Sequence, residues 1–530
     1  MLDRRYIHLL WLPLLLYLFA LFYRLAWFEQ ITSIANDSVN YLLMARYYSP
    51  WVPASGAIQA AWPLQDFPPL FPLLLAISGA AHSLLAAHVL VVAMGLLSLF
   101  LLYRLSLRWL HDNRLSSRGA AILVVVIFSV SPGYVLGLQG ILSESLYLFL
   151  SLLFLLLCNH QRSLDKGWLA GLAFLLALLI LTRTIGWALW LAVLLQAIAS
   201  SVSTKKNQHS RFFMLVASLA FYLVLQWWLG PDRESHYPGV IADFISGKTG
   251  VGESGIFTVL LSQARTLLEA WHTFWTIYWI DEVSVSYIIV STLLFFSLLE
   301  LFSRLLFNKI DAYYVLIYLG ILFIWPHPGQ MVRLVFPVAA ILVLYSVIRM
   351  MRVLNFTALK NRAWAHYGLA GLLLAVIAPS HAFIHARLSL AEKENLVPVY
   401  EMFRRPNIVD AYQDLLVQNQ MLNDFSALGR QIGGRDGVLY FIPAYPAVLG
   451  GVISKKSTYP VGGENYRELA KRSKMKFILL TRLHPRKTRK GVSGFDGEES
   501  LRGQAKKIWC SYNGQTKKRV SCLYRIQDQG

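Results

Sequence analysis

From Leu9 to Phe28 the chain reads LLWLPLLLYLFALFYRLAWF, and this stretch decides the class of fold. Arg24 is the one charged residue in this stretch. The stretch has the length of about 20 residues that a helix needs to cross a bilayer. Similar runs recur as far as HYGLAGLLLAVIAPSHAFI at 366–384. Of the 530 residues, 56% are hydrophobic and 15% are charged, whereas soluble domains carry about a quarter charged residues. The composition predicts a polytopic α-helical membrane protein. It excludes a soluble enzyme, a fibre, a disordered chain and a disulfide-stapled secreted module.

The apolar runs predict about eleven transmembrane helices. The fifth and sixth are so close together that we expect a tight hairpin between them. The first is too long for a cleavable signal peptide and lacks a small-residue cleavage site, so we expect a signal anchor. We place the spans at 8–27, 83–103, 119–136, 141–158, 167–182, 185–200, 211–229, 284–303, 311–325, 333–350 and 364–384.

Lysine and arginine are concentrated in one set of loops, which predicts the orientation of the chain. They lie in the amino terminus and in the loops near 104–118, 162–166, 205–211, 304–309 and 349–362, while the short opposite loops offer little beyond Arg183 and Arg333. Basic loops face the cytoplasm. The amino terminus is therefore expected in the cytoplasm, and an odd number of spans then places the carboxyl end outside.

Two long segments, 28–82 and 230–283, interrupt the spans on the predicted outer face. The first contains NDSVNYLLMARYY and LQDFPPLFPLLLAI, which are apolar enough for interfacial helices. The second joins a polar glycine-rich stretch to WHTFWTIYWIDE. Tryptophan and tyrosine at that density are typical of a belt at the level of the lipid headgroups.

The composition changes near residue 386, and 386–530 predicts a small extracytoplasmic α/β domain. Strand-like runs (VLYFIP at 438–443, KFILLT at 476–481) alternate with helical ones such as ENYRELAKRSK. The segment carries much of the net charge of +20. This charge would suit anionic lipid headgroups or an acidic acceptor, or it is an ordinary solvated face. Nucleic acid is not an expected partner on this side of the membrane.

The chain has three cysteines. Cys158 ends a span on the cytoplasmic side, where we expect it to stay reduced. Cys510 and Cys522 flank a hairpin with Asn513-Gly514 at its turn, and in an oxidising compartment they can form a disulfide. The sequence has no Walker loop, dinucleotide fingerprint, HExxH or paired CxxC motif. It therefore offers no support for ATP hydrolysis or a tetrahedral zinc site.

Ionisable residues at span ends on the predicted outer face are few, which makes them candidates for function. Together they could hold a phosphate with arginine and activate a hydroxyl with a carboxylate. They are Asp37, Asp66, Glu144, Arg183, Asp281, Glu282 and Arg333.

Several candidates also have a plain structural interpretation. Asp37 and Glu144 could each cap a helix, and Asp66 could be a structural residue placed by Pro68-Pro69. Arg333 and Arg183 bind a phosphate or snorkel to the interface.

The acidic pair Asp281-Glu282 could hold a divalent cation such as Mg²⁺ or Mn²⁺, or it is simply solvated. No cofactor is required by the sequence. His236, His272 and His327 are expected to form hydrogen bonds at the interface rather than to bind a metal ion.

The order of these motifs resembles the GT-C glycosyltransferases, especially bacterial relatives of the protein O-mannosyltransferases and the lipid A aminoarabinose transferase. A first loop with Asp37 and Tyr41 is followed by PPLFPLLLA, and a Ser-Glu-x-Leu start to the fourth span follows that. A T-R-x-x-G hairpin and the R-x-x-x-P run from Arg333 to Pro337 come next. The resemblance covers roughly 1–385. Relatives often have Asp-Glu where this chain has Asp37-Ser38, and some have lysine at the position of Phe67.

The resemblance implies transfer of a sugar from a polyprenyl phosphate to a hydroxyl of a glycan, lipid or protein, within surrounding membrane lipids. Asp37 is then the catalytic base and Glu144 the second acidic catalytic residue. Arg333, with Arg183, binds the donor phosphate. Tyr41 and Asp66 lie in the substrate cavity, and a single displacement inverts the anomeric carbon.

Two other classes of function remain open from the sequence. A transporter or lipid flippase would also have many spans and embedded arginines, but we find no paired repeats with interrupted helices at matching positions, which are the usual mark of alternating access. The second class is a non-catalytic subunit, which would recruit a partner through residues 386–530. Cleavage of a labelled lipid-linked sugar distinguishes an enzyme from both.

Overall fold

A computed structural model describes most of the chain. The described residues are 4–26, 37–61, 67–112, 117–158, 166–203, 208–229, 256–276, 285–325, 327, 330–356, 371, 373–375, 377–386, 389, 408–432, 436–440, 443–456, 466–481, 495, 498, 501–512, 514, 517 and 519–527.

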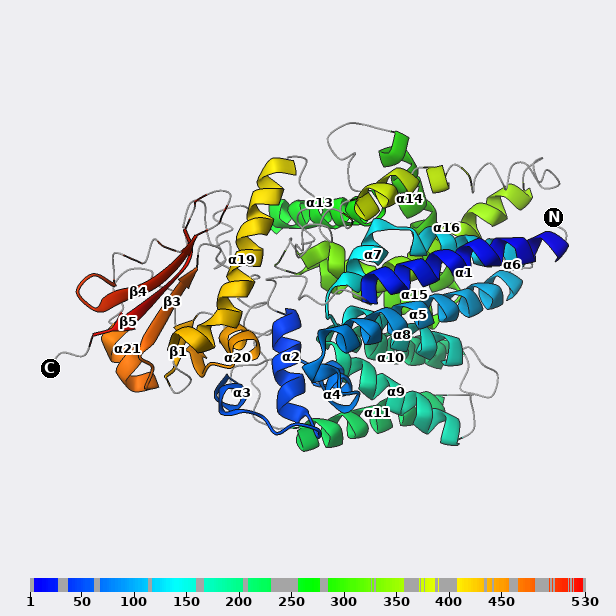
Figure 1. Cartoon of the computed structure of the whole chain (residues 1–530). Helices are drawn as coiled ribbons and strands as arrows, with labels where there is room; N and C mark the ends of the chain where they lie inside the picture. Colours follow the sequence, from blue (N-terminus) through cyan, green and yellow to red (C-terminus); the bar gives the residue numbers. More distant parts are fainter. Residues whose placement is uncertain are drawn as a thin grey trace. The chain divides into compact units, whose positions relative to one another are not determined.

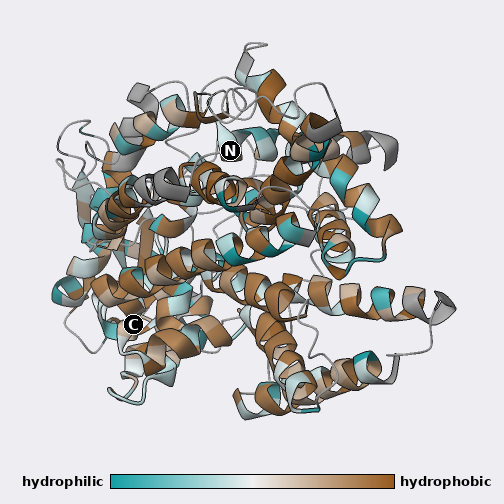
Figure 2. Ribbon diagram, turned by 90° about the vertical axis from the view of Figure 1, so that its right-hand side faces the viewer, coloured by the Kyte–Doolittle hydropathy of each residue, from teal (hydrophilic) through white to brown (hydrophobic). Residues whose placement is uncertain are grey.

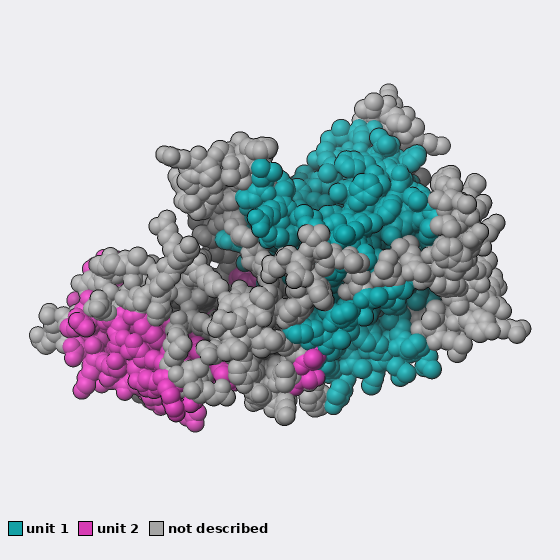
Figure 3. All heavy atoms as spheres, turned by 90° about the horizontal axis from the view of Figure 1, so that it is seen from above, with its two compact units in different colours: residues 1–28, 68–71, 88–385 teal, residues 29–67, 72–87, 386–530 magenta. Residues whose placement is uncertain are grey.

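The chain divides into two compact units, coloured teal and magenta in Figure 3. Unit 1 comprises 1–28, 68–71 and 88–385, and unit 2 comprises 29–67, 72–87 and 386–530. The last boundary between the units coincides with the composition change near 386. Most of the first long loop, however, groups with the carboxyl-terminal segment rather than with the apolar helices.

Unit 1 is built from helices that follow the apolar runs of the sequence (Figure 1). Hydrophobic residues dominate these helices in Figure 2. The described residues between 371 and 386, in the last expected span, are helical as well. The helices are α1 (Arg4–Ala26), α5 (Leu84–Asp112), α6 (Ser117–Ser129), α7 (Pro132–Gln139), α8 (Glu144–Cys158), α9 (Lys166–Thr182), α10 (Trp187–Ser203), α11 (Gln208–Leu229), α13 (Ile256–Trp275), α14 (Val285–Leu306), α15 (Ile310–Phe323) and α16 (Met331–Phe356).

The length of these helices bears on the expected number of spans. Among the described residues, four helices are long and apolar enough to cross a membrane: Leu84–His111, Ser210–Leu229, Ser286–Leu306 and Met331–Leu354. A bent pair makes a fifth if it is one span. The other apolar helices have 10–17 residues where their side chains are described, which is at or below the shortest length for a span. Helix α1 has 23 residues as a whole and enters this range only from Leu12. The structure thus contains a helix at each expected position but does not establish eleven crossings.

The expected span at 119–136 is two helices rather than one. Helices α6 and α7 meet at 57°. Ser131 caps α7 by accepting a hydrogen bond from the Tyr134 backbone nitrogen, and Pro132 occupies its first turn. Proline and a capping serine both favour a new helix start. The Ser-Pro pair therefore causes the bend.

Helix α13 lies inside the segment expected as the second long loop. It packs against α7 and α16. Phe274, near its carboxyl end, is fully buried and contacts the rings of Phe128 and Phe336 at 6.0 and 6.4 Å between centroids. These rings form part of the core of unit 1, so α13 belongs to the packed helices.

The first and last helices of unit 1 are joined by Arg24. Its guanidinium donates to the ring nitrogen Nδ1 and to the backbone oxygen of His385, both at 2.9 Å. The charge of Arg24 within the first apolar run is thereby placed against polar atoms of the last helix.

Unit 2 contains short helices from the first loop and a carboxyl-terminal sheet domain. From the first loop come α2 (Asp37–Tyr48), α3 (Gly56–Ala61), the 3-10 turn η2 (Ala80–His82) and most of α4 (Leu70–Ile77). The sheet domain supplies helices α19 (Ile408–Ile432), α20 (Ala444–Gly450) and α21 (Tyr466–Ser473).

The sheet has five strands in the order β2-β1-β3-β5-β4. Strands β1, β2 and β3 are parallel to one another, while β5 is antiparallel to both β3 and β4. Alternate side chains of β3, Ile478 and Leu480, enter a core with Leu439 and Tyr524. The expected small α/β domain is therefore present. The strands are β1 (Val438–Tyr440), β2 (Ser454–Lys456), β3 (Phe477–Thr481), β4 (Ala505–Tyr512) and β5 (Arg519–Ile526).

Cys510 and Cys522 form a disulfide between β4 and β5. The two residues are directly opposite in the strand register, as the hairpin with Asn513-Gly514 at its turn predicts. Cys158 is the free cysteine.

Candidate functional site

Glu144 is the centre of the strongest polar cluster among the sequence candidates. It opens α8, where a carboxylate is favoured by the positive end of the helix dipole. Its side chain is 1% exposed. A charge buried so deeply is stable only with partners, and two arginines provide them.

Arg183 and Arg333 both bind the same oxygen of Glu144. Arg183 Nη1 lies 2.6 Å and Arg333 Nε 2.7 Å from Oε1. Arg183 also donates to Ser143 Oγ at 3.3 Å. The three charged residues come from α8, from the turn after α9 and from α16. The structure therefore brings together three candidates that lie far apart in the sequence.

A close backbone approach fixes the turn that carries Arg183. A Cβ atom on Gly186 would lie 2.4 Å from the carbonyl oxygen of Leu179. The Gly186 nitrogen donates to the Arg183 carbonyl oxygen at 2.8 Å, and Arg183 itself is extended. Only glycine lets the chain turn back so closely on α9. This is the structural reason for glycine in the T-R-x-x-G motif.

Pro337 affects the turn of α16 that carries Arg333. It lies inside α16, four residues after Arg333. Proline has no N–H group, so it cannot donate to the carbonyl of the residue four positions earlier. The R-x-x-x-P motif therefore loosens the turn of α16 that carries the arginine.

Buried tyrosines support both arginine segments, and the sequence interpretation missed them. Tyr147 donates to the Ile185 carbonyl at 3.4 Å and accepts from Tyr314 at 3.3 Å. Tyr318 donates to the Leu334 carbonyl at 2.8 Å. Ile185 lies in the turn after α9, two residues beyond Arg183, and Leu334 directly follows Arg333. The signal was Tyr314 and Tyr318 four residues apart on α15, but this spacing is equally typical of an apolar core.

Charge decides what the Glu144 cluster can bind. Among the residues that the structure describes, two guanidinium groups face one carboxylate, which leaves one positive charge in excess. The arginine side chains remain 13% and 20% exposed while Glu144 is almost fully buried. Arginine binds phosphate oxygens with a planar fork of donors. The cluster therefore suits an anion that approaches from the arginine side.

Asp37 and Tyr41 lie in unit 2, on α2. Asp37 is the first residue of the helix and is partly buried, and the eight residues that follow it are buried. Tyr41 packs edge-on against the ring of Phe67, with 5.2 Å between centroids. An acidic residue at the first position of a helix stabilises it through the helix dipole. The position of Asp37 therefore fits both a helix-capping role and a role as catalytic base.

The other candidates are not placed by the structure. Asp66, Asp281 and Glu282 lie outside the described residues. Within the part of the chain that is described, no three His, Cys, Asp or Glu side chains are grouped closely enough to hold a metal ion. Among the three histidines expected at the interface, His272 is 2% exposed and lies 3.2 Å from Ser291 Oγ.

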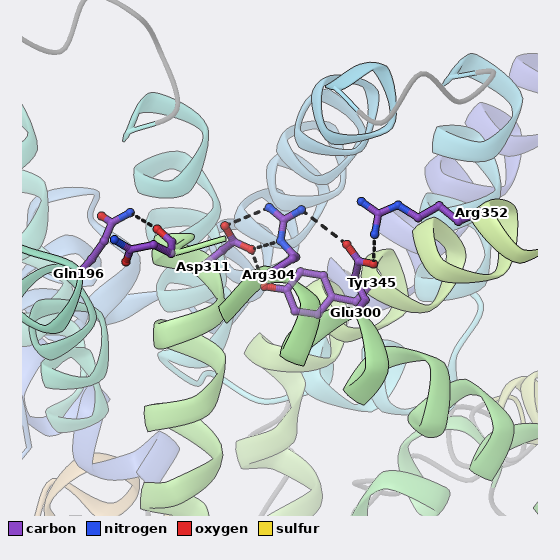
Figure 4. A network of polar contacts seen from close by, with 7 residues as sticks. Gln196, Glu300, Arg304, Asp311, Tyr345 and Arg352 are labelled. Atoms are coloured by element: carbon purple, nitrogen blue, oxygen red, sulfur yellow. Dashed lines mark hydrogen bonds and ion pairs between the residues drawn. The ribbon is translucent and has the colours of Figure 1, made fainter. Parts of the chain in front are cut away.

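A second buried ionic cluster lies near the far end of α16 from Arg333 (Figure 4). Arg304 binds Asp311 with two bonds, of 2.5 and 3.0 Å, and lies 3.9 Å from Glu300. Arg352 binds the other oxygen of Glu300 at 2.6 Å. The Tyr345 hydroxyl donates to Asp311 at 2.5 Å. Two arginines and two carboxylates make these contacts, and the charge of Arg349 also acts on Glu300.

No family model matches the chain, and no curated protein sequence does. Among solved structures, apo ArnT from Cupriavidus metallidurans matches with a TM-score of 0.52 and 11% identity over 97% of each chain. The Archaeoglobus fulgidus oligosaccharyltransferase tethered to an acceptor peptide matches with a TM-score of 0.51 and 13% identity, over 99% of this chain and 74% of the other.

The fold is that of the GT-C membrane glycosyltransferases. The resemblance expected from the motif order is confirmed at the level of the fold. It extends beyond residues 1–385, because both alignments also include nearly all of the carboxyl-terminal domain.

Proposed function

We propose that the protein is a glycosyltransferase that moves a hexose or pentose from a polyprenyl-phosphate donor to an acceptor hydroxyl. The observation that carries this proposal is the pair of arginines on Glu144, an anion site with excess positive charge in a GT-C fold. In the reaction, the acceptor oxygen bonds to the anomeric carbon. The bond from that carbon to the phosphate oxygen breaks, and the polyprenyl phosphate leaves with the electron pair. One displacement inverts the carbon.

Each residue has a separate role in this proposal. Arg333 and Arg183 bind the donor phosphate and stabilise the charge that develops on it as it leaves. Asp37 accepts the proton of the acceptor hydroxyl. Glu144 orients the two arginines, because its carboxylate is already engaged by both. Tyr41 and Asp66 line the acceptor region.

The proposed location is the inner membrane of a bacterium, with the reaction on its outer face and lipids around the helices. Basic loops support a cytoplasmic amino terminus. The Cys510–Cys522 disulfide supports an oxidising compartment for the carboxyl-terminal domain. The acceptor is a hydroxyl of a glycan, a lipid or a protein.

The test uses purified full-length protein in liposomes with a labelled polyprenyl-phosphate sugar. Wild-type protein is expected to release polyprenyl phosphate and transfer or hydrolyse the sugar. Arg333→Lys should raise the donor KM about tenfold, because lysine keeps the charge but loses the fork. Arg265→Lys is the matched control, since Arg265 is 82% exposed, and it should behave as wild type. Movement of the lipid without cleavage would support a transporter instead.

Asp37→Asn separates the base from the cap. Asparagine caps a helix about as well as aspartate but cannot accept a proton. We expect normal accumulation, an unchanged donor KM and a kcat lower by ~10²–10⁴. Near-normal turnover of the folded Asn variant would remove Asp37 from the mechanism.

A further inference from the structure

Helix α20 of the sheet domain packs against α2, the helix that begins at Asp37 (Figure 1). Both helices belong to unit 2. Residues 38–45 of α2 are buried, as are residues 444–448 of α20. The helix that carries the proposed base is therefore packed against the carboxyl-terminal domain.

Arg46 ties the carboxyl end of α2 to two other segments. Its Nη1 donates to the Val448 carbonyl at 2.6 Å, and its Nε donates to the Ala81 carbonyl at 3.1 Å. Val448 lies in the last turn of α20, where carbonyl groups lack partners within the helix. A guanidinium group there satisfies one carbonyl and complements the negative end of the helix dipole. One side chain thus joins α2, η2 and α20.

Near the other end of α2, Tyr445 of α20 lies within electrostatic reach of Asp37. Burial raises the pKa of the Tyr445 hydroxyl well above its usual range, and the charges of Tyr440 and Asp37 raise it further. The Tyr445 ring is fully buried and stacks on Phe425 of α19, with 5.1 Å between centroids. The Tyr445 side chain therefore packs α20 against α19.

Two glycines fix α20 against α19. A Cβ atom on Gly450 would lie 2.5 Å from the Phe425 carbonyl oxygen, and one on Gly429 would lie 2.8 Å from the Gly450 carbonyl oxygen. Such distances leave no room for a side chain on either helix. Helix α20 is therefore packed closely on α19 as well as on α2.

We propose that the carboxyl-terminal domain takes part in the reaction by fixing α2, with Arg46 as the positioning residue. An α-helix is stiff over the span of about 14 Å between Asp37 and Arg46. Anchoring its carboxyl end to α20 therefore sets the place of Asp37 at its amino end. The inference rests on the proposed role of Asp37 as the base. Donor binding, which is assigned to Arg183 and Arg333 in unit 1, does not depend on it.

The experiment measures motion and turnover in the same full-length proteins. Hydrogen exchange follows the peptide 37–48, and the transfer assay gives kcat per bound donor, so that unfolded protein does not count. In Arg46→Lys we expect exchange of 37–48 to rise about tenfold, because lysine cannot bind two carbonyls with one fork. The kcat should fall about tenfold while the donor KM stays within about twofold of wild type.

Two further variants complete the test. Gly450→Ala pushes α20 away from Phe425 without touching α2, and it should reproduce the Arg46→Lys result. Arg472→Lys is the control, since Arg472 is 77% exposed and pairs only with Glu468 among the contacts described; it should match wild type. Unchanged exchange or unchanged kcat in both Arg46→Lys and Gly450→Ala would overturn the inference. An inactive wild type would instead overturn the proposed function, and the exchange of 37–48 would still decide whether Arg46 anchors α2.

Discussion

Glu144 is a buried carboxylate that pairs with Arg183 and Arg333, so a substitution at this position should affect stability strongly. Replacing it with glutamine keeps the shape and removes the charge. Arg183 and Arg333 would then be largely buried without a counter-ion, which costs about 3 kcal/mol or more of folding free energy. We expect Glu144→Gln to lower the unfolding temperature, measured by thermal denaturation in detergent.

A phosphate ligand should partly reverse that loss. It would supply the missing negative charge, so polyprenyl phosphate should raise the unfolding temperature more in Glu144→Gln than in wild type. Glu269→Gln is the matched control, because Glu269 forms an ion pair with an exposed arginine and exposed pairs contribute about 1 kcal/mol at most. Equal stability of Glu144→Gln and wild type would contradict the role of Glu144 as the shared counter-ion.

At the level of single residues, the sequence identified the charged residues of the Glu144 cluster as candidates but not their contacts. Glu144, Arg183 and Arg333 were identified because charges are rare at the ends of apolar spans. That all three meet at one oxygen depends on how α8, α9 and α16 pack, and no local pattern encodes it. Tyr147 and Tyr318 were missed because a tyrosine within an apolar helix resembles an ordinary core residue.

Among the elements, α14, α15 and α16 are joined by the ionic cluster of Figure 4. Arg304 makes two bonds to Asp311 and lies over the Trp109 ring at 4.2 Å, whereas Arg352 binds Glu300 at one nitrogen and is more exposed. Lysine preserves the charge at either position but not the fork or the stacking. Arg304→Lys should therefore destabilise the protein by on the order of 2 kcal/mol more than Arg352→Lys. Equal unfolding temperatures for the two variants would show that the fork contributes nothing.

Helix α19 is attached to the sheet through Asp424, which is 3% exposed. Burial raises the pKa of Asp424, while hydrogen bonds from Ser511 at 2.5 Å and Gln420 at 3.0 Å act in the opposite direction. A raised folded-state pKa means that the stabilising contribution is complete below the unfolded value of about 3.9 and is lost as the pH rises through the folded value. We expect Asp424→Asn to be at least as stable as wild type at pH 7, with the difference vanishing at acidic pH.

Glu498 has a pKa shift opposite in direction to that of Asp424 and serves as its control. Burial would raise its pKa, but hydrogen bonds from Lys507, Tyr524 and Arg519 lower it to about 2. Its stabilising contribution is present above the unfolded pKa of about 4.3 and is lost as the pH falls toward 2. Glu498→Gln should thus be less stable than wild type at pH 7. Pulse proteolysis of the full-length protein across pH measures both variants, and parallel pH curves would contradict the assignment.

The elements themselves were predicted to different degrees. Apolar runs gave helix positions because hydrophobic length is a local property. The bend between α6 and α7 could have been predicted from Ser131-Pro132, a signal for a helix start. Helix α13 was interpreted as a loop because it is amphipathic: its polar residues lie on one face and interrupt the apolar run along the sequence. The sheet strands VLYFIP and KFILLT were recognised, but the pairing of β3 with β5 is non-local.

At the scale of the whole molecule, the grouping of the first loop with the carboxyl-terminal domain was not predicted. Residues 29–67 and 386–530 are far apart in sequence but belong to one compact unit. The contact between α2 and α20 explains why, since α2 buries its apolar surface on α20 as well as on η2 and α3 of the same loop. A domain boundary predicted from composition divides the sequence at one position. It cannot detect that an early segment packs with a domain at the other end of the chain.

The sidedness of the membrane is the last prediction. If the basic loops are cytoplasmic, then residues near 160, 205 and 357 face the cytoplasm, and the carboxyl-terminal domain faces outside. Reporter fusions at these loops should be active only as cytoplasmic reporters. A fusion after 385 should be active only when exported, and Cys510 and Cys522 should be oxidised in protein isolated from membranes. The two readouts are independent, because the first depends on the number of crossings and the second on the redox state of the compartment. Free thiols together with a cytoplasmic fusion after 385 would require an even number of spans, and would place the domain that packs on Asp37's helix on the side where no polyprenyl-linked sugar is proposed to react.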